Sequence, residues 1–138
     1  MKLLNVIIIL NEWLAIRDEL VFKNKGKALD IGAGRGISSY ALTLDGWKVT
    51  ALKPDKSDIV GTGAIKSFCE QAKINIKIIE AFGEKLPFPD NYFDLVYVRQ
   101  ALHHANDLNK FCCEVQRILK KGGIFIATRE HVISKKKI

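Results

Sequence analysis

The sequence has little cysteine, with three residues in 138, Cys69, Cys112 and Cys113. The three show no metal-ligand spacing, and adjacent Cys112 and Cys113 would make an awkward disulfide, so the sequence favours neither a zinc site nor a disulfide framework. All three stand at apolar positions of predicted helices, so we expect small core residues. Together with the lack of a secretion signal, this cysteine usage predicts a cytoplasmic protein.

Long apolar runs are also lacking. The apolar run that begins at residue 5 stops at Asn11-Glu12, which is too short to cross a bilayer. No small-residue cleavage site follows it, which argues against a signal peptide. Apolar residues recur at helical spacing, so we predict an amphipathic helix over about 3–22 that packs on a sheet. A helix on a membrane surface is the weaker alternative, and we expect no membrane partner.

Acidic residues are fewer than basic ones, 15 against 22, which gives a net charge of +7. The lysines are spread along the chain except at 135–137, and no aromatic–basic alternation suggests a stacking surface. We therefore interpret the charge as a solvated surface. Nucleic acid is a less favoured partner than a small molecule. With 48% apolar residues and no low-complexity segment, residues 1–138 are expected to form one domain.

Helical and strand-like segments alternate along the rest of the chain. This alternation predicts an α/β fold: a Rossmann-like, doubly wound, mostly parallel sheet with helices on both faces, in three layers. Gly46 should end the first of these helices, and Asp107 should cap the last. The predicted strands are 28–31, 48–52, 76–79, 93–98 and 124–128, and the predicted helices are 37–45, 58–72 and one that begins after Asp107.

The most specific motif runs from Ala28 to Gly36 and reads as a strand, a glycine-rich loop and the start of a helix. Glycines at 32, 34 and 36 let the main chain turn tightly and approach a ligand closely. Dinucleotide loops need G-x-G-x-x-G, which would place glycine where Ile37 stands. With Asp30, the pattern is instead D-x-G-x-G-x-G.

This pattern resembles the first motif of the class I S-adenosylmethionine-dependent methyltransferases, of the type 11-like group. Later segments resemble further family motifs in the expected order, so that the similarity covers about 27–134; they are 49–54, 83–88, 93–96, 101–104 and 119–123. The resemblance implies S-adenosylmethionine as cofactor, S-adenosylhomocysteine as product, and strand order 3-2-1-4-5. It also implies that the usual sixth and seventh strands are missing. The fifth strand would then be an exposed edge, which permits a homo-oligomer.

The resemblance also assigns binding residues. The glycine loop would lie under the methionine and ribose portions, and Asp30 would contact the amino group directly or through water. A capping role in the loop is the alternative for Asp30. Phe82 would either stack on the adenine or be a core residue. The full predicted cofactor set is Asp30, Gly32, Ala33, Gly34, Gly36, Leu52, Lys53, Pro54, Phe82, Gly83, Glu84, Val98 and Arg99.

Lys53 departs from the family pattern, because an acidic residue usually ends the second strand and accepts hydrogen bonds from the ribose hydroxyls. A lysine can only donate, and its charge repels a sulfonium ligand. Losing the usual interaction costs about 1.5–3 kcal/mol. Asp55 is a candidate substitute acceptor. We predict that Lys53→Glu tightens S-adenosylmethionine binding.

Methyl transfer from a sulfonium needs mainly a well-positioned acceptor, with a general base when the acceptor is weakly acidic. His104 and His131 are the candidate bases, although structural roles are commoner for such histidines. Three functions are open at this point. The first is a small-molecule methyltransferase. The second is a truncated, weakly active or inactive relative that only binds the cofactor, its product or a partner chain. An NAD-dependent oxidoreductase is disfavoured by Ile37 and Lys53.

Overall fold

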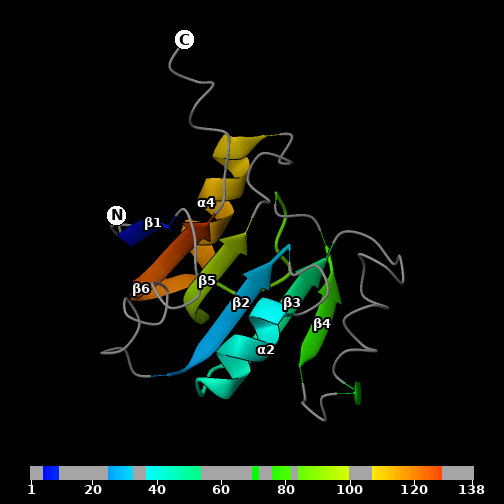
Figure 1. Ribbon diagram of the computed structural model, residues 1–138. Coiled ribbons are helices and arrows are strands. Elements are labelled where there is room, and N and C mark those ends of the chain that lie inside the picture. Colours follow the sequence, from blue (N-terminus) through cyan, green and yellow to red (C-terminus); the bar gives the residue numbers. More distant parts are fainter. Residues whose placement is uncertain are drawn as a thin grey trace.

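A computed structural model of the chain describes residues 5–9, 25–32, 37–53, 70–71, 76–81, 84–99 and 107–128. These residues form a six-stranded sheet with helices on both faces (Figure 1). The strands are β1 (Asn5–Ile9), β2 (Lys27–Ile31), β3 (Lys48–Lys53), β4 (Lys77–Glu80), β5 (Phe93–Arg99) and β6 (Leu119–Thr128); the helices are α2 (Ile37–Leu44) and α4 (Leu108–Ile118).

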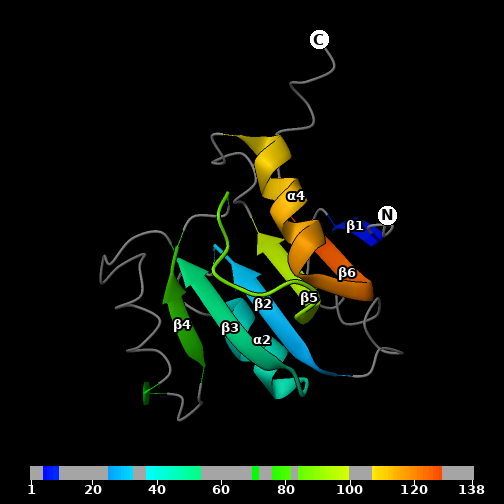
Figure 2. The same ribbon diagram turned by 180° about the vertical axis from the view of Figure 1, so that it is seen from behind.

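The strand order is β1-β6-β5-β2-β3-β4, and every neighbouring pair is parallel. The five strands expected from the sequence are β2 to β6, so their predicted order 3-2-1-4-5 is confirmed. Helix α2 covers one face, and α4 covers the opposite face (Figures 1 and 2). The predicted three-layer architecture is therefore correct. Because all the strands run the same way, their carboxyl ends lie along one edge.

Strand β1 corrects the prediction of a helix over about 3–22. Residues 5–9 are extended and pair in parallel with 124–128 of β6, whereas 10–24 lie outside the described residues. The reason is compositional, because four consecutive β-branched residues follow Asn5 and suit a strand better than a helix. An all-apolar run also fits a helical period by chance. The predicted open edge on the fifth strand is therefore wrong, since β1 covers that edge of β6.

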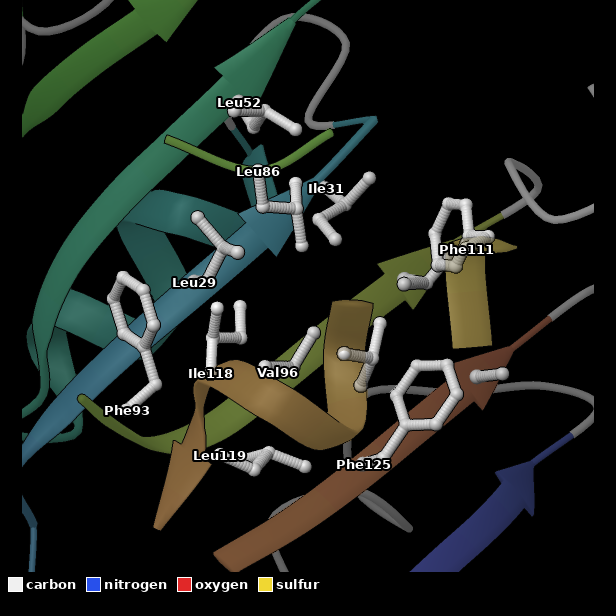
Figure 3. Packing of buried hydrophobic residues seen from close by; sticks show 13 residues of the cluster. Leu29, Ile31, Leu52, Leu86, Phe93, Val96, Phe111, Ile118, Leu119 and Phe125 are labelled. Carbon is white, nitrogen blue, oxygen red and sulfur yellow. The ribbon is translucent and has the colours of Figure 1, made fainter. Parts of the chain in front are cut away.

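Two apolar clusters fill the space between sheet and helices. The cluster under α2 contains Leu42 and Trp47. The cluster under α4 contains Phe111, Val115 and Ile118, which face the buried side chains of the central strands (Figure 3). Of the residues from which the sequence predicts the inward face of this helix, Phe111 and Val115 are buried, whereas Leu108 is exposed and Leu119 belongs to β6. Cys112 of this helix is half-buried, but Cys113 is exposed, so its predicted core position is wrong; Cys69 lies outside the described residues.

The ends of the helices agree with their predicted signals. Gly46 has a φ of 101°, a left-handed conformation, and Trp47 N–H donates to the Leu42 carbonyl at 3.1 Å to close the end of α2. Asp107 accepts a hydrogen bond from Lys110 N–H and caps α4. Of the helix predicted over 58–72, only Glu70 and Gln71 are described, and they are helical. Neither α2 nor α4 has the length and hydropathy of a bilayer-spanning helix.

Strand β6 begins earlier than predicted, directly after α4. Leu119 pairs with Phe93, and the regular ladder resumes only where Ile124 pairs with Leu95. The residues between form a bulge, in which Gly122 has a φ of 85°. The sequence predicts that Gly122 and Gly123 form a turn before this strand, but both lie within it.

Candidate functional site

The carboxyl edge of the sheet is the place where ligands bind in open α/β folds, at the point where the strand order reverses. That reversal lies between β2 and β5, because β2 pairs with β3 on one side and with β5 on the other. The chain reaches this point at Ile31 and Gly32 and then continues into α2. The glycine motif predicted from the sequence therefore begins at the switch point.

Asp30 joins β2 to α2. Its side chain is fully buried, and its Oδ2 accepts hydrogen bonds from the Ser38 and Ser39 hydroxyls, each at 2.6 Å. Both serines belong to the first turn of α2, where a carboxylate is also favoured by the helix dipole. Hydrogen bonds to a charged acceptor are short and strong, so this contact fixes the two ends of the glycine loop relative to each other.

Gly32 starts the loop. Its φ is 74°, which an L side chain adopts only with strain, and its N–H donates to the Leu52 carbonyl of β3 at 3.1 Å. Ala33, Gly34 and Gly36 of the predicted site lie outside the described residues. The structure thus supports a tight turn at the first glycine. Contact of Asp30 with a ligand stays a prediction, because the described bonds of its Oδ2 go to the serines.

The end of β3 carries the residue that departs from the family pattern. Lys53 is half-buried, and its carbonyl accepts from Ala81 N–H at 3.2 Å. Its register partner on β4 is Glu80, so a carboxylate stands on the adjacent strand. Leu52 is 1% exposed and packs in the cluster under α4. Pro54 and Asp55 lie outside the described residues.

The loop after β4 approaches the start of α4. Glu84 Oε2 accepts from Asp107 N–H at 3.2 Å, so this residue of the predicted cofactor set binds the residue that caps α4. Phe82 and Gly83 lie outside the described residues. Tyr97 of β5 and Thr128 at the end of β6 share a buried hydrogen bond of 3.1 Å between their hydroxyls.

The remaining predicted residues are placed only in part. Val98 is fully buried in the cluster under α4, and Arg99 ends β5, where it pairs with Thr128. His104 and His131 lie outside the described residues. Within the described segments, no three His, Cys, Asp or Glu side chains are grouped as they would be around a metal ion.

Sequence reasoning missed the polar contacts that hold this site together. Ser38 and Ser39 were available as a signal, because two hydroxyls stand directly after a glycine loop that follows a strand-end acid. Arg117, which binds the loop after β4, carried no comparable signal, since its partners Leu86 and Phe88 are bound through their carbonyls. A sequence pattern does not show which backbone groups a side chain will bind.

Known proteins resemble both the sequence and the structure of this chain. Residues 29–127 match the family described as "Methyltransferase domain". An uncharacterized methyltransferase, YcgJ of Bacillus subtilis, is 33% identical over 108 residues, which cover 72% of this chain and 39% of YcgJ. A sterol 24-C-methyltransferase of Gibberella zeae is 37% identical over 100 residues, covering 72% of this chain and 26% of that enzyme.

Solved structures have the same fold. The crystal structure of YcgJ superposes with a TM-score of 0.74 at 28% identity, covering 81% of this chain and 47% of that one. A putative S-adenosylmethionine-dependent methyltransferase of Methanococcus maripaludis gives a TM-score of 0.72 at 28% identity, covering 82% and 53%. The matched region thus spans about half or less of each of these relatives.

Proposed function

The chain belongs to the methyltransferase domain family, and from this premise we propose that it binds S-adenosylmethionine and transfers the methyl group to a small-molecule acceptor. The observation that carries the proposal is the junction at the switch point. There Gly32 turns in the left-handed conformation while buried Asp30 fixes the start of α2. Gly32 thus presents main chain rather than a side chain at the carboxyl edge.

The described residues fit the methionine portion of this ligand but not its ribose. The turn at Gly32 suits close approach of the methionine portion, as the family resemblance implies. Lys53 offers no acceptor to a ribose, but Glu80 stands beside it as a carboxylate on the next strand. The proposed binding set is therefore weaker than usual on the ribose side.

Methyl transfer depends mainly on how the donor and the acceptor are positioned. S-adenosylmethionine supplies an activated methyl group on a positive sulfur. The acceptor's lone pair forms the new bond to carbon as the carbon–sulfur bond breaks, and the electron pair stays on sulfur. A base then takes the acceptor's proton, and His104 and His131 are the candidates for that role. Holding donor and acceptor in line can supply much of the rate.

The names of relatives favour a small acceptor. Besides the sterol enzyme, a ubiquinone/menaquinone biosynthesis C-methyltransferase of Francisella philomiragia is 31% identical over 99 residues, covering 70% of this chain and 40% of that enzyme. An arginine-hydroxylase of Rattus norvegicus is also 38% identical over 99 residues. Family membership alone therefore does not fix the reaction, which makes a direct test necessary. We also propose a cytoplasmic location, on the cysteine usage.

Thermal unfolding with ligands tests the proposal. S-adenosylhomocysteine at about 100 times its dissociation constant should stabilise the fold by roughly 2.7 kcal/mol, and NAD should have no effect. Methyl transfer to a panel of small acceptors is then assayed with labelled S-adenosylmethionine. Stabilisation without transfer would favour the second function, a binding protein. No stabilisation by either adenosyl ligand would overturn both.

A matched pair of glycine variants locates the binding. Gly32→Ala and Gly122→Ala both force an alanine into a positive φ, at 74° and 85°, so both should lose a similar amount of stability, about 1 kcal/mol. A Cβ at Gly122 meets no atom within 4 Å, and this glycine lies in the bulge near the amino end of β6, at the opposite edge of the sheet. Binding of S-adenosylhomocysteine should weaken only in Gly32→Ala. Equal affinities in the two variants would place the ligand elsewhere.

A further inference from the structure

The segment between β4 and β5 lies beside α4 on the same face of the sheet (Figure 2). It leaves the carboxyl edge after Ala81 and returns to the opposite edge at Phe93, where β5 begins (Figure 2). Leu86, near its start, is 3% exposed and points among Leu52 and Ile31 (Figure 3). One apolar anchor therefore seats this loop against the two strands that end at the proposed ligand site.

Arg117 of α4 holds the same loop by polar contacts. A guanidinium has five N–H donors, and all five are used here. Two go to the backbone carbonyls of Leu86 and Phe88, at 2.9 and 2.8 Å. One goes to Asp90 Oδ1 at 2.9 Å, and two go to the carboxylate of Glu114, at 2.8 and 3.0 Å. These carboxylates raise the pKa of Arg117 above its usual range.

Glu114 completes the arrangement one turn earlier on α4. Its Oε1 also accepts from Leu86 N–H at 2.9 Å, so both backbone polar groups of Leu86 are bound by side chains of α4. Farther along, the loop donates directly to the helix: Asn91 N–H to the Arg117 carbonyl at 2.9 Å, and Tyr92 N–H to the Ile118 carbonyl at 2.7 Å. The loop is thus fixed at its middle and its end.

We propose that Arg117 is a positioning residue for S-adenosylmethionine: with Glu114 it fixes the loop over 84–92, so that the chain just before Leu86 is presented at the carboxyl edge. The proposal rests on the proposed function. Arg117 acts through the loop, since its bonds reach Leu86 and not the edge itself. Lysine cannot replace it, because one ammonium group cannot bind two carbonyls and two carboxylates that surround a planar fork.

The test compares Arg117→Lys with Ile126→Val. The second substitution removes one methyl group from the core on the opposite face of the sheet and does not affect the loop. Calorimetry should show S-adenosylhomocysteine binding about tenfold more weakly to Arg117→Lys, and less than about twofold more weakly to Ile126→Val. The ligand 5′-methylthioadenosine lacks the amino acid portion. If the loop positions the adenosyl side of the ligand, the affinity of Arg117→Lys for 5′-methylthioadenosine should fall by the same factor. Comparable affinities in the two variants would overturn the proposal.

Hydrogen exchange without ligand gives a second measurement. Amides over 84–92 should exchange faster in Arg117→Lys, whereas those of β2 and β3 should not change. Unchanged hydrogen exchange of the amides over 84–92 would show that Arg117 does not fix the loop. If the unmodified protein binds no adenosyl ligand, the proposed function fails and the ligand role of Arg117 fails with it. If Arg117→Lys does not fold, Glu114→Gln, which keeps the arginine and the side-chain shape, should show the same changes at smaller size.

Discussion

Lys53 at the end of β3 is the register partner of Glu80 at the end of β4, so opposite charges stand on adjacent strands at the carboxyl edge. The chain continues from Glu80 to Ala81, whose N–H donates to the Lys53 carbonyl at 3.2 Å. A substitution at Lys53 therefore acts on two things at once: the proposed ribose contact and the pairing of β3 with β4.

Lys53→Glu should tighten S-adenosylmethionine binding by roughly tenfold or more, because it restores an acceptor and removes a repelling charge. The same change places two carboxylates beside each other and should lower the free energy of unfolding by up to about 1 kcal/mol. Calorimetry and urea denaturation measure the two effects separately. Lys53→Gln is the control, since it removes the repulsion without adding a charge next to Glu80. Unchanged or weaker binding of Lys53→Glu would contradict the predicted ribose contact.

Asp30→Asn should lower the free energy of unfolding by about 1.5–3 kcal/mol, because a buried charged acceptor of two short hydrogen bonds becomes neutral. Urea denaturation at neutral pH measures the loss. Ser39→Ala removes one of the two donors, and the double variant completes a cycle. Because the residues are in contact, the two losses should not add. Additive losses would show that the contact contributes little to stability.

Glu114 should make stability depend on pH. The hydrogen bond from Arg117, and then that from Leu86 N–H, lowers its pKa from the ordinary 4.5 against the opposing effect of burial. A carboxyl whose pKa is lower in the folded state adds stability above its unfolded pKa and loses it as the pH falls through the folded value. Unfolding free energies of the unmodified protein and Glu114→Gln should therefore differ by a constant amount at neutral pH, and the difference should shrink below about pH 4.5. A difference that is independent of pH down to 3 would contradict the assignment.

Ile7→Pro should detach β1 and leave the edge of β6 open, because the proline ring restricts φ and removes a backbone donor at the centre of the five-residue strand that pairs with 124–128. Sedimentation should then show association that increases with concentration. Asn5→Pro is the matched control, since proline is tolerated at the first residue of a strand. A monomeric Ile7→Pro protein with unchanged stability would mean that β1 does not protect this edge.

The strands β2 to β6 were predictable because each contains a short apolar run, although β6 begins earlier than its run. The glycine motif showed where the site begins. Strand β1 was not predictable. Its five residues fit both a helical and a strand period, and they do not reveal a partner strand that lies near the far end of the chain. The same holds for the site. The roles of Gly46 at the end of α2 and of Asp107 as the cap of α4 depend on residues close in sequence, and both were predicted correctly. The contacts of Arg117 and of Glu84 join segments more than twenty residues apart, and residue types alone do not reveal them.

The pairing of β1 with β6 also bears on the order in which the molecule assembles. The strand that a ribosome would make before any other described strand has as its neighbour the one made last, so it must wait for nearly all of the described sheet to emerge. Closing so long a loop is entropically costly and slow, and the inner strands can form from nearer partners first. Addition of β1 is then a late step in folding, and until it occurs a nascent or partly folded chain carries an unprotected border on which chaperones or other chains can act.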